Sequence, residues 1–247
     1  MKWFIGCSGF HYTGWRGRFY PEDLPMKQWF EYYCEHFNTV ELNVTFYRYP
    51  TPAMLESWYK RSPSDYKFTT KAPRLITHYK RFNDSQRLLD DFYTVVSKGL
   101  QKKLGTVLFQ LPGSIAYSDA MLEKIINTLR PEFSNVLEAR HRSWWNENVF
   151  NELAKKKITF CSVSHKELPA DVVQNTSTIY YRLHGVPRLY QSQYRASTLK
   201  RITDEIESKK NVKEVYVYFN NDVSAAAIRN AKQVQQLVQE KQLSSAA

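Results

Sequence analysis

Eight short segments rich in β-branched and aromatic residues recur along the chain, and stretches with the periodicity of amphipathic helices separate them. The segments span residues 3–7, 39–43, 67–71, 106–110, 135–138, 158–162, 179–183 and 215–219. Because a strand that alternates with a helix is followed by a strand in the same direction, the pattern predicts a parallel sheet. Eight such units in 247 residues are typical of an α/β protein, a TIM-like (β/α)8 barrel with outer helices.

No linker or low-complexity segment divides the chain, so we expect a single domain over residues 1–247, with a frayed tail from about 240 to 247. An open, doubly wound sheet is the alternative fold, and it usually carries a glycine-rich turn after its first strand. The sequence Gly6-Cys7-Ser8-Gly9 is a poor match to the pattern G-x-G-x-x-G. The closed barrel is therefore the preferred fold.

The chain is basic, with 35 Lys and Arg residues against 24 Asp and Glu residues and a formal net charge of +11. A basic surface favours anionic partners such as nucleic acid or phosphorylated metabolites, although lysines also simply solubilise helix surfaces. The cysteines, Cys7, Cys34 and Cys161, lack metal-ligand spacing and suit a reducing, cytoplasmic location. The N-terminal segment lacks the apolar core of a signal peptide, and no apolar run is long enough to span a bilayer, so we expect no membrane partner.

Polar residues stand at the carboxyl ends of the predicted strands, where the side chains of a barrel meet in one mouth. They are Glu41, Asn43, Lys71, Gln110, Glu138, Arg140, His141, Arg182, His184, Asn220, Asn221 and Asp222. Salt bridges that close the top of the barrel would explain such residues in part, because buried charges need partners. Apolar side chains would fill the mouth at a lower cost in free energy, so the pattern favours a functional cleft.

Two predicted connections at the same end of the barrel are long and aromatic, residues 8–25 and 185–196. Long loops in this position form lids or cleft walls. Tyr12 and Trp15 in the first loop, and Tyr47 after the second strand, can stack on a base or a sugar.

Several motifs in combination resemble the YecE-like family, also called domain of unknown function 72. They are Gly6-Cys7-Ser8-Gly9-Phe10, Trp15-Arg16-Gly17-Arg18-Phe19-Tyr20-Pro21, Phe37-Asn38-Thr39-Val40-Glu41-Leu42-Asn43, Thr45-Phe46-Tyr47-Arg48, Lys71-Ala72-Pro73, Ile76-Thr77-His78, Leu108-Phe109-Gln110-Leu111-Pro112, Glu138-Ala139-Arg140-His141 with Trp144, Tyr181-Arg182-Leu183-His184-Gly185 and Tyr218-Phe219-Asn220-Asn221-Asp222. The resemblance spans essentially the whole chain and implies a TIM-like barrel, without a settled activity. The chain departs from the family at Cys7, Phe10 and Ala139, where Thr, Trp and Phe are common, and no charged group is lost.

The strand ends predict an enzyme that binds, and hydrolyses or isomerises, a small phosphate- or carboxylate-bearing ligand. Arg140 and Arg182 can bind an oxyanion in a bidentate manner, and Lys71 adds a point charge. The other expected binding residues are Asn43, Gln110, Asn220, Asn221, Tyr12, Trp15 and Tyr47.

Three residues are the candidate catalysts. Glu41 or Glu138 can act as the general base, and His184 as the acid or proton shuttle, because an imidazole titrates near neutral pH. A structural histidine beside a glycine turn is the alternative interpretation of His184.

No cofactor is predicted. In a metal-dependent alternative, of the phosphodiesterase or nuclease type, Glu41, Glu138, His184 and Asp222 would hold one divalent ion. The basic residues of the same mouth would repel that cation, and the sequence has no HxH or HExxH spacing.

Two alternative functions do not involve catalysis. The sequence predicts no oligomeric state. A nucleic-acid-binding protein would use basic charge for phosphates and aromatic rings for bases, although no helix-turn-helix, RRM or zinc-finger pattern is present. A non-catalytic scaffold would use Trp58, Trp144 or Trp145 as interface anchors, although such residues more often belong to a helix core.

Overall fold

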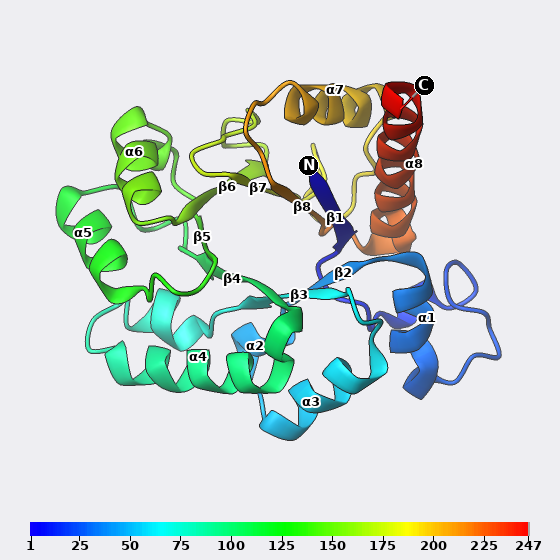
Figure 1. The fold of residues 1–247 in the computed structure, drawn as a ribbon, viewed down its shortest axis with the longest axis horizontal. Helices are drawn as coiled ribbons and strands as arrows, with labels where there is room; N and C mark the ends of the chain where they lie inside the picture. The colour runs from blue at the N-terminus through cyan, green and yellow to red at the C-terminus, as the bar shows by residue number, and fades with distance from the viewer. Residues whose placement is uncertain (247) are drawn as a thin grey trace.

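Eight parallel strands surround a common axis in the computed structural model, which describes residues 1–246, and helices ring the strands (Figure 1). The strands are β1 (Lys2–Cys7), β2 (Thr39–Leu42), β3 (Lys67–Lys71), β4 (Leu104–Gln110), β5 (Asn135–Glu138), β6 (Thr159–Ser164), β7 (Thr178–Leu183) and β8 (Glu214–Phe219). Their hydrogen-bonded order is β1-β8-β7-β6-β5-β4-β3-β2, so sequence neighbours are also neighbours in space. The predicted α/β barrel is therefore confirmed.

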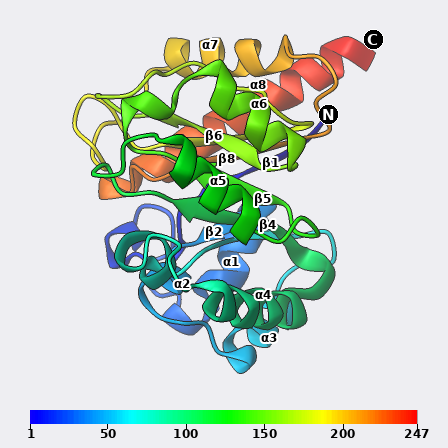
Figure 2. The same cartoon turned by 90° about the vertical axis from the view of Figure 1, so that its left-hand side faces the viewer.

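Helices cover the outside of the barrel, with α7 and α8 on one flank and α3 and α4 on the opposite flank (Figure 2). They are α1 (Trp29–His36), α2 (Val44–Tyr47), α3 (Pro52–Arg61), α4 (Gln86–Leu100), α5 (Asp119–Thr128), α6 (Glu147–Lys155), α7 (Ala196–Glu207) and α8 (Ala226–Ala246). The connection from β6 to β7 departs from the regular pattern, because residues 165–177, all of them described, form no helix. Asn175 ties this connection to the barrel by accepting from the Phe160 amide at 2.8 Å and donating to the Ile158 carbonyl at 2.9 Å.

Helix α4 shows how the local sequence builds the outer layer. Leu89, Phe92 and Val96 recur at intervals of three and four residues, and all three are fully buried. Arg87 and Asp91, on the opposite face, are exposed. This spacing places one apolar stripe against the barrel and leaves the charged stripe in water.

The barrel interior changes from aromatic to polar toward the carboxyl ends of the strands. Phe4 stacks on Tyr216 with ring centroids 4.7 Å apart. Beyond this pair, the Tyr218 hydroxyl lies 2.6 Å from the Thr39 hydroxyl and 2.9 Å from the Thr69 hydroxyl. Because these three hydroxyl groups satisfy one another, the barrel buries them without leaving them unpaired.

Side chains close the barrel between β1 and β2, since these two strands share no backbone ladder among the described residues. The Asn38 side chain accepts from the Ile5 amide at 3.1 Å and donates to the Trp3 carbonyl at 2.8 Å. Tyr33 acts in the same way one step further along β1, where its hydroxyl accepts from the Cys7 amide at 2.7 Å.

Gly6 allows the close approach of β1 and β2. A Cβ atom at this position would lie 2.3 Å from the Thr39 carbonyl oxygen and 2.9 Å from the Tyr33 hydroxyl. Only a residue without a side chain fits at this contact.

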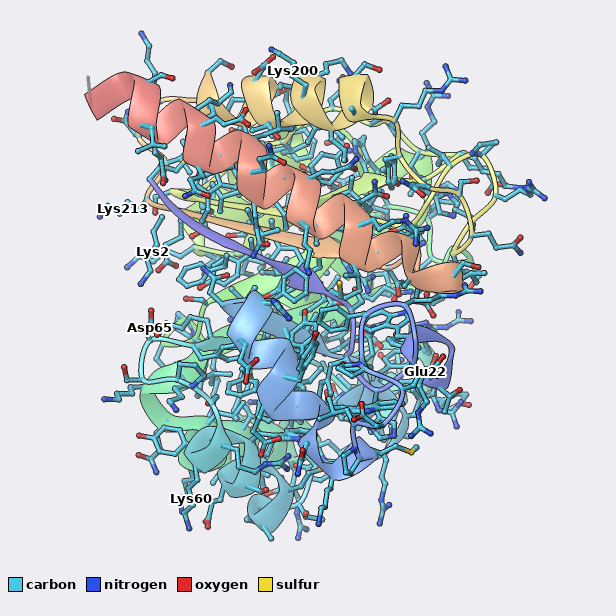
Figure 3. The ribbon with its side chains drawn as sticks, turned by 90° about the vertical axis from the view of Figure 1, so that its right-hand side faces the viewer. Lys2, Glu22, Lys60, Asp65, Lys200 and Lys213 are labelled. Carbon is cyan, nitrogen blue, oxygen red and sulfur yellow. The ribbon has the colours of Figure 1, made fainter. Side chains whose placement is uncertain are left out.

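Helix α8 packs against β1, β8 and α7 (Figure 3). Helical geometry continues to Ala246, into the segment that composition predicts to fray, and the Ser244 hydroxyl donates to the Glu240 carbonyl at 2.9 Å. Fraying itself stays a prediction, and Ala247 lies outside the described residues. Within residues 1–246, no helix combines the length and the apolar character that crossing a bilayer requires.

The tryptophans named as candidate interface anchors pack inward to different degrees. Trp144 is completely buried and its indole donates to the Ile115 carbonyl at 3.0 Å, so it offers no exposed surface to a partner. Trp58 and Trp145 are half-buried and pack against the hydrophobic core.

Candidate functional site

A cavity of about 500 Å³ lies at the carboxyl ends of the strands. Its lining residues are Tyr12, Asn43, Phe46, Tyr47, Lys71, Arg74, His78, Tyr79, Gln110, Arg140, Arg182, Tyr190, Asn220 and Asp222. Among these described residues, the cationic side chains are Lys71, Arg74, Arg140 and Arg182, whereas Asp222 is the one carboxylate. The cavity wall therefore carries an excess of positive charge.

A buried ion network forms the floor of this cavity. Arg182 of β7 crosses the barrel interior between Glu41 of β2 and Glu138 of β5, and all three side chains are buried. Arg182 donates to Glu41 Oε2 at 2.9 Å through Nε and to Glu41 Oε1 at 2.6 Å through Nη2, and it donates to Glu138 Oε2 at 2.5 Å through Nη1. The Tyr180 hydroxyl adds a hydrogen bond to Glu41 Oε2 at 2.5 Å.

Burial would raise the pKa of Glu138, but the guanidinium groups of Arg140 and Arg182 hold it well below its usual range. Arg140 forms an ion pair with the second oxygen of this carboxylate. The network thus joins two carboxylates to two guanidinium groups, and each carboxylate is already in contact with at least one cation.

His184 extends the network at the end of β7. Arg140 Nη2 lies 2.8 Å from His184 Nε2. Nδ1 lies 3.1 Å from the side-chain amide of Asn220. Burial first, and then Arg140 and Arg182, lower the pKa of His184 to about 3. His184 is therefore uncharged at neutral pH.

Lys71 ends β3 and reaches the cavity from its side. The side chain is only 7% exposed, and Nζ lies 4.1 Å from the centroid of the Phe46 ring. Among the described residues, Nζ has neither a hydrogen-bond acceptor nor a salt-bridge partner. Burial, reinforced by Arg182 and Arg140 and opposed by the carboxylates of the floor, lowers the pKa of Lys71 to about 7.

Exposed tyrosines form the rim of the cavity. Tyr47, Tyr79 and Tyr190 are 68%, 65% and 44% exposed. The Arg74 guanidinium lies 5.7 Å from the Tyr47 ring and 5.6 Å from the Tyr79 ring. Such a rim offers flat faces to an aromatic or sugar group, next to a cation.

The structure brings most of the predicted binding residues to this cavity. Those that line it are Lys71, Arg140, Arg182, Asn43, Gln110, Asn220, Tyr12 and Tyr47. Glu41, Glu138 and His184, the predicted catalysts, are completely buried beneath the lining. Their catalytic roles stay a prediction.

Two predicted binding residues have structural partners away from the cavity. Trp15 is completely buried, and its indole donates to the Asp222 carbonyl at 2.9 Å. Asn221 is also buried and donates to the Ser192 carbonyl at 2.9 Å and to Asn230 at 3.0 Å. Both side chains therefore hold the loops that follow β1, β7 and β8.

Sequence reasoning missed Phe46, Arg74, His78 and Tyr79 as lining residues. Three of them follow Pro73, and the turn from Leu75 to Tyr79 has the hydrogen-bond spacing of a π-helix. The motif Ile76-Thr77-His78 was a signal for this segment, but no periodicity indicated which of its side chains face the cavity.

A second, mainly apolar cavity of about 570 Å³ lies beside the first and shares Tyr12 and Asn43 with it. Phe10, Phe30 and Trp58 contribute to its lining. The Tyr12 side chain lies between the two cavities. Its hydroxyl donates to the Ser8 carbonyl at 2.6 Å, which holds the ring in this position.

The residue set considered for a metal ion does not converge on one point. Within the part of the chain that the structure describes, no three His, Cys, Asp or Glu side chains lie close enough together to coordinate an ion. Glu41 and Glu138 face Arg182, and His184 faces Arg140, so their donor atoms are directed at cations of the protein.

Comparisons with known proteins agree with this architecture. The sequence profile described as "Protein of unknown function DUF72" matches residues 4–247. UPF0759 protein YunF of Bacillus subtilis is 24% identical over 266 residues, covering 92% of this chain and 93% of YunF. UPF0759 protein YecE of Escherichia coli is 31% identical over 112 residues, and this match spans 45% of the chain and 41% of YecE.

Solved structures have the same fold. A DUF72 family protein (TM1631) of Thermotoga maritima superposes with a TM-score of 0.87 at 28% identity, over 97% of this chain and 100% of that protein. A DUF72 family protein (EF0366) of Enterococcus faecalis superposes with a TM-score of 0.81 at 18% identity, over 96% of this chain and 95% of that protein.

Proposed function

The chain belongs to the DUF72 family, and from the charges at its barrel mouth we propose that it binds a small phosphate- or carboxylate-bearing ligand in the 500 Å³ cavity. The observation that carries the proposal is the uncompensated positive charge of the cavity wall. Glu41 and Glu138 are engaged by the guanidinium groups of the floor, and neither forms an ion pair with Lys71 or Arg74. An anionic ligand supplies the missing counter-charge.

The size and the rim of the cavity define the ligand further. A volume of this order suits a small metabolite, since ligand sites usually measure about 300–1,000 Å³. The tyrosines at the rim favour a ligand with a ring, whose face packs on Tyr47 or Tyr79 while its anionic group reaches Lys71 and Arg140.

Hydrolysis or isomerisation of this ligand is the reaction that we propose. Glu41, Glu138 and His184 lie behind the arginines, so in this arrangement they orient Arg140 and Arg182. Lys71 lines the cavity with a perturbed pKa and with a head group that has no ion-pair partner among the described residues. Cavity-lining groups with such pKa values are typical of catalytic sites.

A ligand-induced stability measurement tests the proposal. Inorganic phosphate and malonate at about one hundred times their Kd would add about 2.7 kcal/mol to the stability, which raises the Tm by roughly 5–11 °C. Arg140→Gln should abolish this shift, whereas Lys60→Gln, on the exposed face of α3 (Figure 3), should leave it intact. If neither anion raises the Tm, or if Arg140→Gln responds like the unaltered protein, the cavity is not an anion site.

Nucleic acid is the second candidate ligand, favoured by the exposed tyrosines beside Arg74 and by the net charge of +11. Stacking on Tyr47 and Tyr79 would suit the unpaired bases of a single strand. We expect the affinity for a fluorescent single-stranded oligonucleotide to fall steeply with salt and to weaken on Tyr47→Ala. Absence of binding at low salt would eliminate this candidate.

A further inference from the structure

Lys71 differs from Arg140 and Arg182 because its buried head group has no counter-ion within the described structure. Arg182 is held by two carboxylates and Arg140 by one, whereas the Lys71 amine faces the Phe46 ring. A lysine that only needed to hold an anion would keep its charge most easily in water or beside a carboxylate. Here the surroundings instead favour the neutral amine.

Hydrogen bonds hold the backbone at Lys71 in a fixed position. Lys71 is the last residue of β3 and pairs in register with Leu108 of β4. The Thr45 hydroxyl donates to the Lys71 carbonyl at 2.6 Å, and the following amide, of Ala72, donates to the Leu108 carbonyl at 2.8 Å. The side chain therefore extends from rigid backbone, as precise chemistry requires.

The charged and titratable groups that surround the amine come from four strands or their following loops. They are Glu41 of β2, His78 after β3, Glu138 of β5 with Arg140 after it, and Arg182 of β7. Burial and the two arginines disfavour an ammonium ion, and they outweigh the carboxylates because those already face the arginines. Lysines that are desolvated or lie beside another cation are the ones that act as nucleophiles toward carbonyl groups.

We propose that Lys71 forms an imine with the aldehyde or ketone group of an anionic substrate held in this cavity. The inference rests on the proposed function, because the anionic group of the substrate is what Arg140 binds while the carbonyl carbon meets Nζ. The ligand class narrows from anions in general to oxo-acids and phosphorylated aldehydes or ketones.

The chemical step balances without a redox partner. The nitrogen lone pair attacks the carbonyl carbon, a C–N bond forms, and the oxygen takes a proton. The resulting carbinolamine loses its hydroxyl group as water, which carries away both amine protons and leaves a C=N bond. The electron pair of a bond on the neighbouring carbon can then move toward the nitrogen, so the imine suits isomerisation rather than hydrolysis of the substrate.

Reductive trapping tests the inference. The full chain is incubated at pH 7 with limiting pyridoxal 5′-phosphate, used as a phosphate-bearing aldehyde, and sodium borohydride then reduces any imine to a stable secondary amine. With a pKa of about 7, about half of the Lys71 amines are neutral, against roughly one in 2,500 for an ordinary lysine. Peptide mass spectrometry should therefore find Lys71 modified on the order of a thousand times faster than Lys60 or Lys200, which are exposed (Figure 3).

Matched reagents and variants separate this inference from the proposed function. Inorganic phosphate should slow the labelling of Lys71, and pyridoxal without its phosphate should react more slowly there. Lys71→Arg should lose the labelling and keep the phosphate-induced rise in Tm, which also shows that the variant folds. If phosphate raises the Tm but Lys71 is labelled no faster than Lys60, the imine inference is overturned and the anion site stands. If phosphate has no effect on either Tm or labelling, both proposals fail.

Discussion

Replacing Arg182 with methionine tests whether the ion network in the floor of the barrel mouth is as tightly coupled as the structure indicates. The substitution keeps much of the side-chain volume but removes a guanidinium that makes three hydrogen bonds to two buried carboxylates. Glu138 keeps its ion pair with Arg140, whereas Glu41 keeps only the Tyr180 hydroxyl. Most of the expected loss in stability therefore comes from the Glu41 carboxylate, which is left without a cation.

Removing one partner of a buried ion pair usually costs about 3–5 kcal/mol, because the remaining charge is left without compensation. In a protein of this size, each kcal/mol corresponds to roughly 2–4 °C, so Arg182→Met should lower the Tm by about 6–20 °C at pH 7. Glu41→Gln in the same chain removes the uncompensated charge. The double variant should therefore be more stable than Arg182→Met alone, by about 1–3 kcal/mol.

The pH dependence has a definite sign. The depressed pKa of Glu138 stabilises the fold above the unfolded-state value of about 4.3, and this contribution is lost as the pH falls below it. Arg182→Met lacks part of the contribution, so its deficit should be largest at neutral pH and narrower at pH 3.5. Urea unfolding followed by tryptophan fluorescence measures both. A loss below 1 kcal/mol at pH 7, or strictly additive effects of Arg182→Met and Glu41→Gln, would refute the coupling.

Three further predictions concern the fold and its buried groups. Gly6→Ala should destabilise the barrel by about 1–3 kcal/mol, because its Cβ would meet the Thr39 carbonyl, whereas Gly14→Ala, with open space around its Cβ, should stay within about 0.5 kcal/mol in urea unfolding. His184, neutral in the fold, should make stability fall as the pH drops from about 6.5 toward its pKa of about 3, and His184→Gln should remove that slope between pH 7 and 5. The Cys7 thiol, whose pKa burial raises, should resist a disulfide reagent until urea unfolds the chain, and fast labelling would contradict this.

The strands were the most predictable part of the fold. Residues 67–71 and 135–138 coincide with β3 and β5, because each segment has the length and the β-branched or aromatic residues of a strand. The sequence pattern of eight strand-helix units did not predict that residues 165–177 form an irregular connection without a helix. This connection contains Pro169 and gains its order from long-range side-chain bonds such as those of Asn175, which leave no periodic signal.

The convergence of the charged strand ends followed from the parallel fold, but their pairing did not. The sequence placed Glu41, Glu138 and Arg182 at one end of the barrel, because all parallel strands end there. That Arg182 would face both carboxylates depends on how β2, β5 and β7 are arranged around the interior. The sequence alone therefore allowed both salt bridges and catalytic carboxylates at these positions, whereas the structure commits both carboxylates to contacts with arginines.

The pairing of both carboxylates with arginines links the stability of the floor to the reactivity of Lys71. In the intact network the arginines hold both carboxylates and add to the burial that disfavours an ammonium ion. Arg182→Met removes one of those cations and frees the Glu41 carboxylate, so the pKa of Lys71 should rise toward the ordinary value for lysine. Each unit of that rise lowers the neutral fraction of the amine up to tenfold, so borohydride trapping at Lys71 should slow by about one order of magnitude or more at pH 7. Trapping at an unchanged rate in a folded Arg182→Met protein would show that Arg182 and its contact with Glu41 do not tune the pKa of the amine.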